Sequence, residues 1–197
     1  AFFAGRARDG LGLIVAGTLT VSNEVFKRRV GSGFQMMDHS AKPGLYELAE
    51  LAHMYGTKIF MQFSYGMGHQ ISKKDQWPDP TADPITASPI ETELIPPARP
   101  MKADLWHKKM GTKFQIANVE NMMTREATLK EIEEIEDTQA DAALALKTLG
   151  FDGVELHFGH GYFGAGFLSP RLNQRKDKYG GTQEKRMTFA KNCYEKV

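Results

Sequence analysis

The chain has 197 residues, of which 41% are hydrophobic and 25% are charged, a composition typical of a globular domain with one sizeable core. Its 25 basic and 24 acidic residues give a formal net charge of +1, too little of either sign to indicate nucleic acid as a partner. The longest apolar runs, Leu11 to Gly17 and Lys58 to Phe63, are far shorter than the roughly 18 residues of a membrane helix, so no membrane span is expected.

Other bulk features concern the cellular setting and the limits of the domain. No secretory signal is recognisable, which favours a cytoplasmic protein. Cys193 is the only cysteine, so an internal disulfide is excluded. The chain starts without methionine, in a pattern typical of a helix end (Ala1 to Arg8), and stops inside another helical pattern. We expect residues 1–197 to form a single incomplete domain, truncated at both ends.

The first half of the chain predicts two strands with a helix between them. Leu11 to Gly17 is a near-continuous apolar run, typical of a strand buried on both faces in a parallel sheet. Leu45 to Tyr55 has apolar residues at helical spacing and is followed by Gly56, a glycine C-cap. Lys58 to Ser64 is the second strand, and alternation places Gln62 as a polar residue on one of its faces.

The second half begins with a long proline-rich excursion, from residue 65 to about 123, of the kind that usually serves as a lid or binding loop. A capping box at Thr128 and Glu131 then predicts a helix up to Gly150, in which the charges from Lys130 to Asp137 form a solvated face. Gly153 to His157 is the third strand. A last helix starts near Thr182, and its predicted apolar side is Met187, Ala190, Cys193 and Val197.

This order of elements is that of an α/β protein. Strands that alternate with helices pair in parallel through right-handed crossovers. A complete (β/α)8 barrel takes roughly 250 residues. The sequence therefore predicts a partial (β/α)8 TIM barrel of about three β/α units with a long proline-rich loop insertion.

Candidate functional residues follow the carboxyl ends of the three predicted strands, where barrel enzymes keep their chemistry. The candidates, in chain order, are Gly17, Gln62, His157, His160 and Tyr162. A glycine lets a flat ligand approach the backbone, and an amide both donates and accepts hydrogen bonds. Together with a histidine pair and a phenol, they suit a planar heterocycle and a carbonyl substrate. A histidine pair alone also suits a metal-dependent hydrolase, although no third ligand has diagnostic spacing.

Glu155 shares a strand face with His157. A carboxylic acid beside a histidine at a strand end suits a glycosidase acid. An interior charge paired with a basic side chain on a neighbouring strand is the expectation we favour.

The segment from Gly150 to Asn192 resembles the central signature of the Old Yellow Enzyme family of FMN-dependent oxidoreductases. The strand ends in H-x-x-H-G-Y, and F-L-S-P, N-x-R, D-x-Y-G-G and E-x-R follow in order. The segments LGLIVAGTLTVS and KIFMQFSYGMGHQ resemble the family's second and third barrel strands. The resemblance covers nearly the whole chain and implies an FMN-binding TIM barrel, of which these residues are an internal fragment.

The resemblance also implies an activity: reduction of the C=C bond of an α,β-unsaturated carbonyl or enoate, with NAD(P)H as electron donor and hydride from flavin N5. It implies that His157 and His160 bind the substrate oxygen and that Tyr162 donates the proton. Gln62 would bond the flavin pyrimidine edge, and Gly17 would let the ring lie close to the backbone. The partner would be a small-molecule activated alkene, and the parent protein is a candidate homo-oligomer.

Two alternatives stay open at the level of sequence. Residues 1–197 by themselves are a non-catalytic fragment of such a barrel if the remaining cofactor contacts lie elsewhere, and we expect the isolated fragment to be inactive. Less favoured is a metal-dependent hydrolase barrel with His157 and His160 as ligands.

Overall fold

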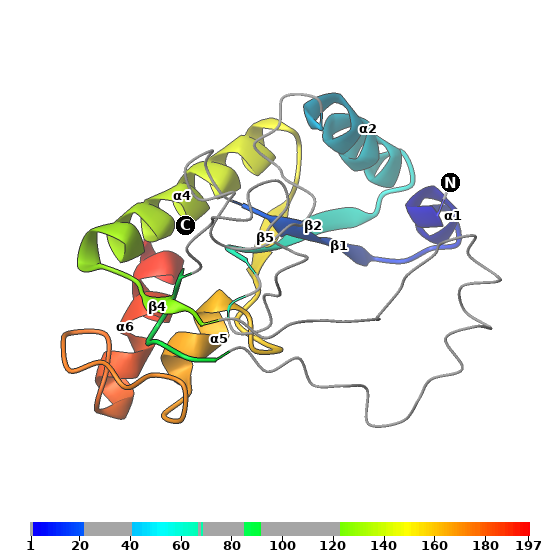
Figure 1. The fold of residues 1–197 in the computed structure, drawn as a ribbon. Coiled ribbons are helices and arrows are strands. Elements are labelled where there is room, and N and C mark those ends of the chain that lie inside the picture. The colour runs from blue at the N-terminus through cyan, green and yellow to red at the C-terminus, as the bar shows by residue number, and fades with distance from the viewer. Residues whose placement is uncertain (1, 22–40, 67, 69–84, 92–122) are drawn as a thin grey trace, which may run out of the picture.

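A computed structural model describes residues 2–21, 41–66, 68, 85–91 and 123–197 (Figure 1). Most of the proline-rich excursion predicted for residues 65 to 123 lies outside the described residues. No helix within the described ranges is long and apolar enough to cross a membrane.

A parallel three-stranded sheet forms the centre of the described structure. Its strands are β1 (Leu13–Thr20), β2 (Lys58–Ser64) and β5 (Gly153–Leu156), in the spatial order β1-β2-β5. All three run in the same direction, so their carboxyl ends meet at one edge of the sheet (Figure 1). This parallel arrangement of strands and helices confirms the predicted α/β class.

The helices occupy the predicted places with shifted ends. They are α1 (Phe2–Arg8), α2 (Lys42–His53), α4 (Leu129–Thr148), α5 (Phe163–Leu168) and α6 (Gln183–Lys196). Helix α2 starts three residues before the predicted Leu45 because Pro43 lies in its first turn, where the fixed φ of proline suits a helix. Tyr55, predicted on its apolar face, lies beyond the helix and is exposed. The short helix α5 has no counterpart in the predicted elements.

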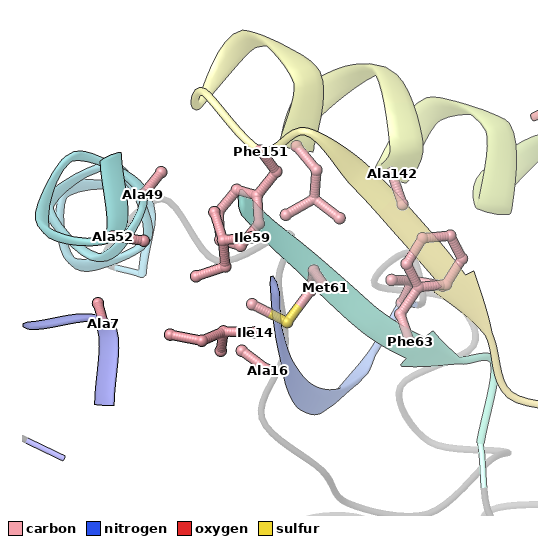
Figure 2. Close-up of a cluster of buried hydrophobic side chains, with 12 residues drawn as sticks. Ala7, Ile14, Ala16, Ala49, Ala52, Ile59, Met61, Phe63, Ala142 and Phe151 are labelled. Atoms are coloured by element: carbon pink, nitrogen blue, oxygen red, sulfur yellow. The ribbon is translucent and has the colours of Figure 1, made fainter. Parts of the chain in front are cut away.

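A first hydrophobic core packs α1, α2 and the C-terminal half of α4 against one face of the sheet. Figure 2 shows Ile14, Ile59, Met61 and Phe63 of the strands directed toward alanines of the helices. Ala49 of α2 is fully buried there, and small side chains of this kind allow close approach of helix and sheet.

The opposite face of β1 is open. Leu13 and Val15 are 47% and 43% exposed, so the prediction that β1 is buried on both faces is wrong for the described structure. In a barrel this face looks inward and is covered by side chains of the remaining strands. The open face is therefore the side on which the interior of a closed barrel would lie.

A second core lies beneath the carboxyl ends of the strands and joins the N-terminal half of α4 to α5 and α6. Its centre is aromatic: the ring of Phe167 stacks on Phe189 with centroids 4.6 Å apart, and Phe163 lies edge-on to Phe189 at 5.7 Å. A small two-stranded sheet, β3 (Ile85–Thr86) with β4 (Arg125–Glu126), contributes Ile85 to this core.

Two predicted helix faces need correction. On α6 the buried residues are Phe189 and Cys193, whereas Met187 and Val197 are exposed, because α6 meets α5 through Phe189. On α4 the charged face is not entirely solvated, since Glu136 is 1% exposed. Its carboxylate accepts hydrogen bonds from the hydroxyl of Tyr179 (3.0 Å) and the amide of Asn192 (2.9 Å).

Candidate functional site

His157, His160 and Tyr162 form a compact cluster at the carboxyl end of β5. The imidazoles of His157 and His160 are stacked at an interplanar angle of 20°, with centroids 5.1 Å apart. The ring of Tyr162 meets His157 edge-on at 4.8 Å. The three side chains that the sequence singled out are therefore brought together, with His157 in the middle.

Local backbone conformation produces this cluster. The amide of His157 donates to the carbonyl of Phe63 (2.9 Å), which extends the β2–β5 pairing by one residue. His160 and Gly161 then have positive φ values of 53° and 75°, and this left-handed pair reverses the chain. The reversal brings the ring of His160 back over His157.

Tyr162 is held by the helix that follows it. The amide of Phe163 donates to the carbonyl of Gly66 (3.1 Å). Phe163 is only 1% exposed and packs in the second core. Gly68 packs so closely here that a Cβ on it would lie 2.6 Å from the backbone of Tyr162 and Phe163. The loop after β2 and the start of α5 therefore fix the phenol together.

The two histidines also interact through their ring nitrogens. Nδ1 of His160 and Nε2 of His157 are 3.2 Å apart, so one nitrogen donates and the other accepts. Burial lowers the pKa of His157 from its ordinary 6.5, and the neighbouring His160 lowers it further, against an opposing effect of the Glu155 carboxylate. Both effects favour the neutral imidazole of His157.

A row of polar side chains crosses the strands next to this cluster. The hydroxyl of Thr18 donates to Oε1 of Gln62, and Nε2 of Gln62 donates to the carboxylate of Glu155. The hydrogen-bond partner of Glu155 among the described residues is the amide of Gln62, and the expected pairing with a basic side chain is not found within these residues. We call Thr18, Gln62 and Glu155 the polar row.

Gly17 lies against the polar row. Its φ is +133°, and a Cβ there would approach the carbonyl oxygen of Gln62 to 2.5 Å. The sequence predicts Gly17 and Gln62 at neighbouring strand ends, and the structure puts them in contact. The sequence predicts no role for Thr18, which bonds Gln62. Its position as a polar residue near the end of the first strand, next to Gly17, is the sequence signal that points to it.

The described residues include no group of three or more His, Cys, Asp or Glu side chains that could hold a metal ion. The nitrogens that face each other in the histidine pair are engaged with one another. Nothing in this geometry favours the metal-dependent hydrolase alternative.

Similarity to known proteins extends over the whole chain. Residues 1–197 match the model of the NADH:flavin oxidoreductase / NADH oxidase family. An NADH oxidase from Thermoanaerobacter brockii is 37% identical over 190 residues, which cover 95% of this chain and 24% of that protein. A cinnamate reductase from Clostridium sporogenes is 29% identical over 202 residues, covering 100% of this chain and 26% of the relative. The chain thus spans about a quarter of the length of these two relatives.

Solved structures show the same fold. The Old Yellow Enzyme homologue from Zymomonas mobilis superposes with a TM-score of 0.75 at 22% identity, over 99% of this chain and 48% of that one. Morphinone reductase, solved in complex with tetrahydroNAD, gives a TM-score of 0.74 at 22% identity, over 99% of this chain and 49% of that one. The described fold is therefore part of a TIM barrel of the Old Yellow Enzyme type, as the sequence predicts. It corresponds to about half the length of each of these two solved chains. With the family model matched from end to end, this chain belongs to the NADH:flavin oxidoreductase / NADH oxidase family.

Proposed function

We propose that the whole protein is an FMN-dependent oxidoreductase that reduces the C=C bond of an α,β-unsaturated carbonyl or enoate with NAD(P)H. The observation that carries the proposal is the cluster of His157, His160 and Tyr162 beside the polar row, in a chain of this family. A cinnamate reductase among the relatives supports the substrate class, because cinnamate is an α,β-unsaturated carboxylate.

The residues at the strand ends fit a flavin. The pyrimidine edge of FMN alternates carbonyl oxygens with an N–H, and the Gln62 amide offers both a donor and an acceptor to such an edge. Gly17 adds no side chain beside Gln62, where even a Cβ would collide with the backbone. Bound FMN would supply a hydride from its N5 atom.

The histidine pair would bind the oxygen of the substrate's activating group. That oxygen gains negative charge as the double bond is reduced, and N–H donors fixed beforehand stabilise such charge. Burial lowers the pKa of His157, which favours a neutral imidazole that donates a hydrogen bond without carrying a charge of its own. A substrate oxygen would replace the present contact between the two imidazoles.

Tyr162 would donate the proton to the carbon next to the activating group. Its ring lies 4.8 Å from that of His157, so a substrate whose oxygen is bound at His157 has its α-carbon in the neighbourhood of the phenol. A positioned phenol is an accepted general acid.

The test is spectroscopic and uses the complete protein. Purified full-length protein should carry flavin absorbance, lose it on anaerobic addition of NADH or NADPH, and regain it when an enone or cinnamate is added. A complete protein that stays colourless after incubation with FMN would refute the proposal. Reduction of the flavin without reoxidation by any activated alkene would refute the substrate class.

A further inference from the structure

Strand register places the polar row at one level of the sheet. Gln62 lies directly opposite Glu155 in the β2–β5 pairing. On the other side, Ala16 pairs with Met61 and Leu19 with Phe63, so two residues of β1, Gly17 and Thr18, oppose Gln62 alone. This extra residue is a β-bulge, a device that redirects side chains and is common beside active sites.

The two neighbours of Gln62, Thr18 and Glu155, differ in whether they can donate a hydrogen bond. A hydroxyl both donates and accepts, so Thr18 accommodates either end of the Gln62 amide. An ionised carboxylate only accepts, so Glu155 attracts the amide NH2 and repels the carbonyl oxygen. The observed bonds are the one arrangement that satisfies both neighbours: Nε2 faces Glu155, and Oε1 faces Thr18.

We propose that Glu155 is a positioning residue that selects the orientation of the Gln62 amide, and with it the order of donor and acceptor presented to the flavin pyrimidine edge. The proposal rests on the proposed function. One N–H of Nε2 is used by Glu155, and one acceptor position of Oε1 by Thr18, which leaves one donor and one acceptor on Gln62 for the ligand. A flipped amide would exchange the positions of this donor and this acceptor. Donor would then face donor, and acceptor would face acceptor, at the flavin edge.

The experiment measures FMN affinity of the apoprotein prepared from the full-length protein, by quenching of flavin fluorescence. Glu155→Gln keeps the size of the side chain and its ability to hydrogen-bond but no longer distinguishes the two ends of the Gln62 amide. We expect FMN binding to weaken about tenfold, the size of one good hydrogen bond. Glu155→Asp keeps the charge, and its FMN affinity should lie between that of the wild type and that of Glu155→Gln. Glu50→Gln, an exposed carboxylate on α2, is the matched control and should bind FMN as the wild type does.

A double-mutant cycle tests whether Glu155 acts through Gln62. In a Gln62→Met background, Glu155→Gln should have no further effect on FMN affinity. An equal loss in both backgrounds would overturn the proposal, since Glu155 would then act on the flavin or on the fold by itself. Thr18→Val should weaken FMN binding less than Glu155→Gln, because the carboxylate alone is selective. The reverse order would also overturn it.

The outcomes separate this inference from the proposed function. If the wild-type protein does not bind FMN, the proposed function fails. If the wild type binds FMN and Glu155→Gln binds it equally well, the positioning role alone fails. Should Glu155→Gln not fold, as judged by circular dichroism, Glu155→Asp decides: it should bind FMN more weakly than the wild type but not in the Gln62→Met background, and wild-type affinity would overturn the positioning role.

Discussion

Tyr162 is the residue whose chemistry is most readily isolated. Its ring packs edge-on against His157, while its position is set by the backbone of Phe163 in the second core. Removal of the hydroxyl therefore takes away the proposed proton donor without removing a structural contact of the ring.

For Tyr162→Phe we expect alkene reduction to slow by about 100-fold or more, the usual contribution of a general acid, with flavin reduction by nicotinamide unchanged. Stopped-flow absorbance of the two half-reactions measures each rate separately. Equal slowing of both half-reactions would contradict the proton-donor role. Tyr194→Phe on the exposed surface of α6 is the control, and neither rate should change.

At the scale of elements, α4 joins the two cores. Ile132 and Ile135 lie in the second core, and Ala142 and Leu146 lie in the first. The start of α4 is secured by the predicted capping box: Thr128 accepts from the amide of Glu131 (3.2 Å), whose carboxylate accepts from the amide of Thr128 (2.8 Å). Arg125 of β4 also donates to both carboxylate oxygens of Glu131, at 2.7 and 2.9 Å.

These bonds predict a pH dependence of stability. Hydrogen bonds from Arg125, partly opposed by burial, lower the pKa of Glu131 from 4.5 to about 2. A carboxyl group with a lower pKa in the folded state stabilises the fold above its unfolded pKa and loses that contribution as pH falls. We expect Glu131→Gln to be less stable than the wild type above pH 4.5, with the difference shrinking between pH 4.5 and about 2.

Urea denaturation at a series of pH values measures this difference. Glu47→Gln, on the exposed side of α2, is the control and should track the wild type at every pH. A constant gap between Glu131→Gln and the wild type over this range would show that the ionised carboxylate is not the source of the stability.

At the scale of the whole molecule, one buried guanidinium joins three distant segments. Arg175, with a side chain 2% exposed, donates to the carbonyls of Ala87 (3.0 Å) and Ala127 (2.7 Å) and to the carboxylate of Asp177 (2.6 Å). It therefore ties the ends of β3 and β4 to the loop that precedes α6.

We expect Arg175→Met to lower the free energy of unfolding by about 3 kcal/mol or more, because it leaves the carboxylate and two buried carbonyls without their donor. Urea denaturation of the full-length protein is the measurement. Arg8→Met, which removes an exposed partner of Asp9, is the control and should change the free energy by less than about 1 kcal/mol. An equally small effect at Arg175 would show that the three segments are held by other contacts.

The sequence by itself determined the order of the three strands of the main sheet and of α2, α4 and α6, and it determined the capping box of α4; it also predicts the end of β5 as the place of the chemistry. These features depend on residues close together in the chain, where apolar periodicity and capping chemistry operate. The family motif extended them to a barrel fold and to named roles for His157, His160 and Tyr162.

Only the tertiary structure decided the contacts between distant residues. Thr86 and Glu126 pair across forty positions of sequence, and Thr18 reaches Gln62 only because a bulge places two residues of β1 opposite one of β2. Glu136 is buried, and Glu155 bonds an amide, for the same reason: a polar side chain's surroundings depend on which element packs against it. Periodicity in the local sequence does not specify which element packs against a given side chain. The partner of each charged side chain is therefore determined by the tertiary packing of strands and helices.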